Sequence, residues 1–85
     1  MPYIPQDKRG KFNTYLNSIA RQFEEKGELT YTIYYLMLKW LEMQEKQNYC
    51  ARSDTRASAQ DAVDEFYRRM MADYEDKAIK RNGDI

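Results

Sequence analysis

The stretch that decides the fold is residues 29–43, Leu-Thr-Tyr-Thr-Ile-Tyr-Tyr-Leu-Met-Leu-Lys-Trp-Leu-Glu-Met. At the spacing of an α-helix its apolar side chains form two stripes on roughly opposite sides. One contains Leu29, Ile33, Leu36, Met37, Trp40 and Met43, and the other contains Tyr31, Tyr34, Tyr35 and Leu38. A helix that is apolar on two sides must be buried on two sides. We therefore expect a helix over 30–47, with Thr30 as its cap, buried by two other helices of the chain or, more easily, by a second subunit.

A second helix is expected upstream of this stretch. Helical spacing of the apolar side chains predicts it over 7–26, with Asp7 capping its first turn. Gly27 is expected to end this helix by supplying a left-handed residue. The two prolines within residues 1–6 disfavour helix there, so these residues are expected to form an extended arm.

A third helix is expected over 53–81, with Ser53 or Asp54 as its cap and Asn82-Gly83 as its stop. A bend or break is expected near Asp73. The core stripe of this helix comprises Ala59, Val63, Phe66, Tyr67, Met70 and Tyr74. The expected fold is all-α: a small three-helix bundle with an extended N-terminal arm, oligomeric, and one domain over residues 1–85.

The composition removes several functional classes. Fourteen Lys and Arg balance fourteen Asp and Glu, which argues against a nucleic-acid partner held by bulk positive charge. There is no His, and the single Cys50 excludes an intramolecular disulfide and a multi-cysteine zinc site. No motif unites a nucleophile, a base and an electrostatic stabiliser, so we expect no enzyme, no catalytic residue, no metal and no cofactor.

The chain carries no signal peptide pattern, and its longest apolar stretch, about thirteen residues, is shorter than the ~20 that a spanning helix needs. We therefore expect no membrane partner. A free cysteine is compatible with a reducing compartment, and the expected location is the cytoplasm.

Eight Tyr against three Phe is the most informative excess in the composition. Tyrosine is favoured where an apolar body meets a polar boundary, as at an interface, and its ring also stacks on bases. We expect Tyr31, Tyr34, Tyr35 and Leu38 to form an oligomer interface. Tyrosines with nearby cations in the last segment are candidates for holding a phosphate-bearing ring: Tyr67, Arg68, Arg69, Tyr74 and Lys77.

The same charges also have a purely structural interpretation. Acid-before-base pairs at i, i+4 stabilise a helix. The third helix contains four such pairs: Asp64–Arg68, Glu65–Arg69, Asp73–Lys77 and Asp76–Lys80. Solvated helix ends therefore remain an alternative to a ligand site.

Several motifs resemble a family of small uncharacterised all-helical proteins encoded by bacteria and their phages. They are the Met-Pro-Tyr-Ile start, the Gly27-Glu28-Leu29 turn, the Glu65-Phe66-Tyr67-Arg68-Arg69 run, and the ending with Tyr74-Glu75-Asp76-Lys77, Ile79 and Asn82-Gly83-Asp84. The match is poor over 47–62, and the family pattern has a proline at the position of Asp73. The resemblance implies an all-α fold and a bacterial or phage source, and it carries no activity.

These observations lead to one main hypothesis and two alternatives. The main hypothesis is a non-enzymatic binding protein that forms homo-oligomers through residues 30–47. The first alternative is a phage counter-defence protein that sequesters a cyclic or linear nucleotide messenger. Small phage proteins of this kind often bind a host protein or a signalling nucleotide, although this is analogy. The second alternative is a DNA-binding regulator, which the acidic run near Asp61 disfavours.

Overall fold

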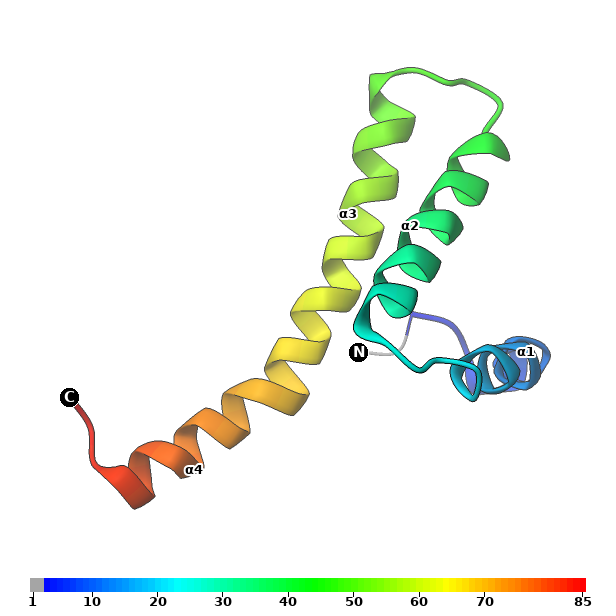
Figure 1. Cartoon of the computed structure of the whole chain (residues 1–85). Coiled ribbons are helices and arrows are strands. Elements are labelled where there is room, and N and C mark those ends of the chain that lie inside the picture. Colours follow the sequence, from blue (N-terminus) through cyan, green and yellow to red (C-terminus); the bar gives the residue numbers. More distant parts are fainter. Residues whose placement is uncertain (1–2) are drawn as a thin grey trace. The chain divides into compact units, whose positions relative to one another are not determined.

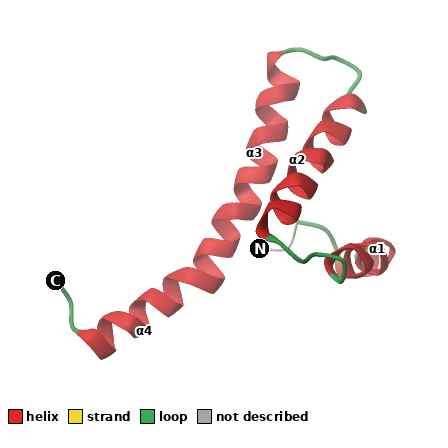
Figure 2. Ribbon diagram, in the orientation of Figure 1, coloured by secondary structure: helices red, strands yellow, loops and turns green. Residues whose placement is uncertain are grey.

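The regular structure is entirely helical, and the all-α prediction is confirmed (Figures 1 and 2). The computed structural model describes residues 3–85, so the expected arm is open to comparison only from Tyr3 onward, and its first two residues lie outside the described part. The elements are the 3₁₀ turn η1 (Gln6–Lys8), α1 (Gly10–Ala20), α2 (Lys26–Glu42), α3 (Tyr49–Phe66), the π turn η2 (Tyr67–Met71) and α4 (Ala72–Asn82).

The chain divides into two compact units, and the boundary falls inside α2, between Leu36 and Met37. The first unit contains η1, α1 and the first part of α2. The second contains the end of α2, the connection to α3, and the run of α3, η2 and α4.

In the first unit, the predicted 7–26 helix is shorter than expected. Pro5 is extended, with φ −60° and ψ 152°, and the η1 turn follows it. Asp7 lies inside this turn and does not cap α1, whose N-terminus has no side-chain cap. The Arg9 side chain donates from Nε to the Ile4 carbonyl oxygen at 3.3 Å, which ties the end of the arm to the start of α1.

The start of α2 corrects the role expected of Gly27. This glycine lies in the first turn of α2, with negative φ, and does not terminate the preceding helix. Glu28, two residues into the helix, folds back so that its Oε2 accepts the backbone N–H groups of Glu24 (2.6 Å) and Glu25 (3.2 Å). This contact satisfies N–H groups that the helix start leaves without intrahelical partners. Thr30, the expected cap, is already helical and donates to the Lys26 carbonyl oxygen.

In the second unit, side chains of the 43–48 connection complete the ends of two helices. Gln47 donates from Nε2 to the carbonyl oxygens of Leu41 (2.6 Å) and Gln44 (2.9 Å), where α2 ends. Asn48 caps α3, because its Oδ1 accepts the Ala51 N–H at 2.9 Å. The helix therefore begins at Tyr49, four residues before the expected start at Ser53, and α2 ends five residues before the expected boundary at residue 47.

The break expected near Asp73 lies earlier, at the π turn Tyr67–Met71, and the ribbon curves there between α3 and α4 (Figure 1). Asp73 instead stands in the first turn of α4. The predicted stop at Asn82-Gly83 is confirmed. Gly83 has φ 84° and ψ 149°, a conformation that is essentially restricted to glycine, and its N–H donates to the Ile79 carbonyl oxygen at 2.7 Å.

The expected core stripes do not form a buried apolar core among residues 3–85. Thr55, with 6% of its surface exposed, is the buried residue of this part of the chain, and its neighbours one turn away, Ala51 and Ala59, are half-buried. The physical reason is size, since units this small have too few elements to surround a large side chain. None of the helices in this part is long and apolar enough to cross a bilayer.

The position of Gly27 gives a stability prediction. A Cβ added there meets no atom within 4 Å, so Gly27→Ala should raise the free energy of unfolding by up to about 1 kcal/mol, because alanine favours helix. Gly83→Ala is the contrasting variant and should lower it by about 1–3 kcal/mol. Thermal unfolding followed by circular dichroism measures both. A lower midpoint for Gly27→Ala would restore the left-handed role predicted from the sequence.

Candidate functional site

The five predicted ligand residues lie on one run of the second unit. Tyr67, Arg68 and Arg69 belong to the π turn η2, and Tyr74 and Lys77 belong to α4. Within the part of the chain that the structure describes, the contacts of these side chains lead to neighbouring residues of the same run rather than to one another. These contacts determine whether each side chain remains able to hold a ligand.

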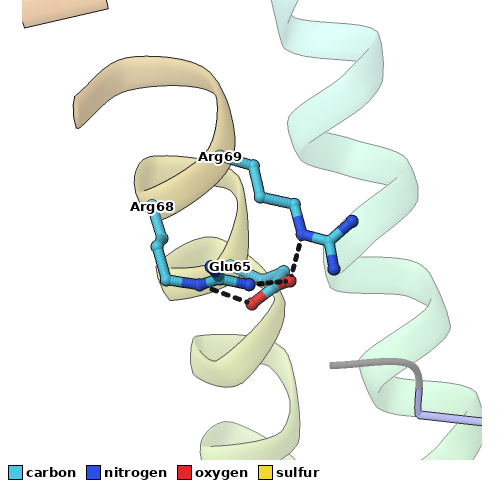
Figure 3. A network of polar contacts seen from close by, with 3 residues as sticks. All are labelled: Glu65, Arg68 and Arg69. Carbon is cyan, nitrogen blue, oxygen red and sulfur yellow. Dashed lines mark hydrogen bonds and ion pairs between the residues drawn. The ribbon is translucent and has the colours of Figure 1, made fainter. Parts of the chain in front are cut away.

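Glu65 holds both arginines at the junction of α3 and the π turn (Figure 3). Its Oε1 accepts from Arg68 Nη2 at 2.8 Å, its Oε2 accepts from Arg68 Nε at 3.3 Å, and Arg69 Nε is paired with Oε1. Hydrogen bonding to Arg68 is the main reason that the pKa of Glu65 falls to about 2. The carboxylate is 21% exposed, while both arginines are well exposed.

Tyr67 is engaged across the π turn. Its hydroxyl donates to Glu75 Oε2 at 2.9 Å, a contact between residues eight apart that joins the first residue of the turn to α4. This hydrogen bond to a carboxylate raises the pKa of Tyr67. The hydroxyl is therefore used in bracing the junction, and the ring remains about half exposed.

Tyr74 and Lys77 have separate neighbours on α4. Lys77 Nζ pairs with Asp73 Oδ2 at 3.2 Å, and both side chains are exposed. The Arg81 guanidinium lies 5.9 Å from the centre of the Tyr74 ring, within the range of a cation–π contact. Arg81 is not among the five predicted ligand residues, but helical spacing places it beside the face that bears Tyr74, and the structure brings its guanidinium near this ring.

The structural interpretation of the charges is partly confirmed. The pairs Glu65–Arg69 and Asp73–Lys77 form as predicted. Arg68, expected to pair with Asp64, pairs instead with Glu65 three residues before it. Asp64 accepts from Gln60 Nε2 at 2.9 Å. An anionic ligand that binds Arg68, Arg69 or Lys77 therefore has to compete with the carboxylates of Glu65 and Asp73, which are already paired with them.

The second candidate surface, the tyrosine face of α2, consists of Tyr31, Tyr34, Tyr35 and Leu38. All four are exposed, from 38% for Leu38 to 65% for Tyr31. The rings of Tyr31 and Tyr35 lie with centroids 5.9 Å apart and planes tilted by 34°, a favourable arrangement for an aromatic pair. The helix thus presents a pre-formed aromatic pair on its surface.

The described residues do not meet the requirements of a metal site. Among residues 3–85 no three His, Cys, Asp or Glu side chains gather in a way that could hold a metal ion. Cys50 is exposed in the first turn of α3. The two candidate surfaces differ in character. The four side chains of the tyrosine face of α2 are uncharged, and the run from Tyr67 to Lys77 combines aromatic rings with paired charges.

One family model matches the chain. It is described as a domain of unknown function, DUF6899, and it covers residues 1–85. No curated protein and no solved structure matches the chain.

The Glu65 contacts give a pH prediction. Because the folded-state pKa of Glu65 lies below its ordinary value of 4.5, its contribution to stability is present above that value and is lost as the pH falls toward 2. Wild type should therefore be more stable than Glu65→Gln at pH 7, and the difference should shrink as the pH falls below 4.5 and be mostly lost near pH 2. Chemical denaturation at a series of pH values measures this. Glu45→Gln, in the connection between α2 and α3, is the control, and an equal effect there would contradict the prediction.

Proposed function

This chain belongs to the DUF6899 family, and we propose that it is a non-enzymatic interaction protein, of bacterial or phage origin, that forms homo-oligomers through α2. The observation that carries the proposal is the exposure of apolar side chains on two flanks of this helix. Tyr31 and Tyr34 on one flank and Leu29 and Leu36 on the other are all about half exposed or more.

The half-buried residues of α2 show why one neighbouring helix cannot cover both of its apolar flanks. Within α2, Met37 and Leu41 are half-buried and lie about 40° apart at 100° per residue, and Thr32 is half-buried on the opposite side. The two apolar flanks lie on either side of the strip formed by Met37 and Leu41. A single helix placed on this strip would leave both flanks in contact with water, at a cost of roughly 25 cal/mol for each Å² of apolar surface.

A second copy of the chain is the partner that this surface favours. Net formal charge is zero, so copies approach without overall electrostatic repulsion. Tyrosine combines a large apolar ring with a hydroxyl that tolerates water, which suits a surface that is exposed before assembly and covered afterwards. The single exposed Cys50 fits a reducing compartment, and we place the protein in the cytoplasm.

Removal of tyrosine rings from α2 should weaken assembly. We expect wild type to sediment as a multimer, and Tyr31→Ser with Tyr35→Ser to raise the dissociation constant by about tenfold or more, because aromatic side chains dominate interface energetics. Tyr49→Ser removes an equally large, more exposed ring at the start of α3 and should leave the dissociation constant unchanged. Analytical ultracentrifugation over a range of concentrations measures all three. A wild type that is monomeric throughout, with an unfolding midpoint independent of concentration, would contradict the proposal.

A second candidate function is sequestration of a cyclic or linear nucleotide. The observation that favours it is the grouping of Tyr74, Lys77 and Arg81 on one run of α4, with the arginine over the tyrosine ring. A base could replace the arginine on the ring, and the two cations could then meet phosphate. The pairing of Arg68 and Arg69 with Glu65 weighs against these two as further ligands.

Nucleotide binding predicts thermal stabilisation. A tight nucleotide at 100 times its dissociation constant should stabilise the protein by about 2.7 kcal/mol, and Tyr74→Ala should abolish the shift. Differential scanning fluorimetry with cyclic and linear nucleotides measures it, with Tyr15→Ala on α1 as the control. If no nucleotide raises the midpoint, a host protein remains as a partner. A regulator that binds DNA is a further alternative, which a salt-dependent gel shift would reveal.

A further inference from the structure

The tyrosine face of α2 carries opposite charges at its two ends. Glu28 precedes Tyr31 by three residues, and Lys39 follows Tyr35 by four. At 100° per residue these two charges lie beside the Tyr31–Tyr35 pair, and Leu38 borders it, within an arc of about 100°. Along the helix the face therefore presents an acid, the aromatic pair and a base, and Glu42, which is paired with that base, follows on the same side.

This order is symmetric about a single point. The midpoint between Glu28 and Lys39 lies between Ile33 and Tyr34, and the midpoint between Tyr31 and Tyr35 is Ile33. The two midpoints differ by half a residue, or about 0.75 Å along the helix. A two-fold axis that passes between two copies at this point would set the aromatic pair of one copy against that of the other, and the acid of each copy against the base of the other.

We propose that the tyrosine face of α2 pairs with the same face of a second copy in antiparallel orientation, forming a two-fold dimer. The inference rests on the proposed function and specifies its partner surface. In this pairing Tyr31 of each copy lies opposite Tyr35 of the other, and Glu28 of each lies opposite Lys39 of the other. A parallel pairing would place Glu28 against Glu28 and Lys39 against Lys39, and would be opposed by like-charge repulsion.

Contacts within the chain fix the Glu28 side chain before it meets the lysine of a second copy. Glu28 uses one oxygen, Oε2, for both backbone N–H groups at the start of α2, and a carboxylate can accept several more donors. Since Glu28 is already fixed by the helix start, little side-chain entropy is lost when it meets a cation. Lys39 pairs at 3.2 Å with the exposed Glu42, three residues away, and an ammonium has three N–H donors to share.

Charge reversal with rescue tests the orientation of the pair. Lys39→Glu should weaken self-association by roughly tenfold, because it replaces two attractive contacts per dimer with two repulsive ones, and the loss should shrink at 1 M salt, where screening is strong. Glu28→Lys should weaken it likewise. An equimolar mixture of the two variants should recover wild-type affinity, since both contacts of the mixed dimer are then attractive. Sedimentation measures the three samples, and Lys46→Glu, in the 43–48 connection, is the matched control.

Two further measurements distinguish a loss of helix α2, a failure of the proposed oligomer and a failure of the antiparallel pairing. Glu28→Gln retains an acceptor for the helix start but removes the charge, so its helix content by circular dichroism shows whether α2 still forms. In a Cys50→Ser background, a short bismaleimide should join Glu28→Cys to Lys39→Cys in a mixture, whereas a parallel pair would join each variant to itself. A wild type that stays monomeric would overturn both proposals. A wild-type multimer that is insensitive to Lys39→Glu, or that cross-links 28 to 28, would overturn the antiparallel pairing alone.

Discussion

The rest of the structure depends on the width of the apolar surface of α2. Taken around the helix, its apolar side chains extend from Leu36 through Met37 and Tyr31 to Tyr35, and leave a polar strip that contains Glu28, Thr32 and Lys39. A neighbouring helix typically covers a stripe roughly 100° wide. A short chain whose units bury no apolar side chain completely cannot satisfy this requirement by itself, and the remaining surface is where recognition is expected.

With little apolar burial to fix the helices, their ends are fixed by local polar contacts. Glu28 accepts backbone N–H groups at the start of α2, and Gln47 donates to a carbonyl oxygen at its end. Asn48, in the same connection as Gln47, caps the start of α3. Each contact joins residues that are close in sequence, so it forms without the loss of chain entropy that a long-range contact requires. This arrangement gives well-defined helices, and it leaves their apolar faces available to a partner.

The sequence was sufficient to predict helices but not their limits. Periodicity correctly indicates helix around Tyr31, Phe66 and Leu16, and glycine correctly indicates the stop after Asn82, because both signals depend on local geometry. The prediction was wrong at Gly27, because a glycine fits either the end of a helix or its first turn. The contact that decides between the two is made by the side chain of Glu28. The prediction also missed Asn48, because Ser53 and Asp54 are equally good caps and composition does not rank them. In the last segment the sequence correctly predicts the pairs Glu65–Arg69 and Asp73–Lys77, but it assigns Arg68 to Asp64 rather than to Glu65, because i, i+3 and i, i+4 pairings compete for the same arginine.

The two candidate surfaces differ in what assembly or binding would cost. At the junction of α3 and α4, Glu65 and Glu75 already satisfy the cations and the hydroxyl of the π turn, so an anion gains only the difference between its own contacts and those it displaces. At the tyrosine face of α2, Tyr31 and Tyr35 already form a tilted aromatic pair, and the proposed second copy packs on rings that are held next to each other. The π turn, with its two bridging carboxylates, is better suited to setting the angle at which α4 leaves α3.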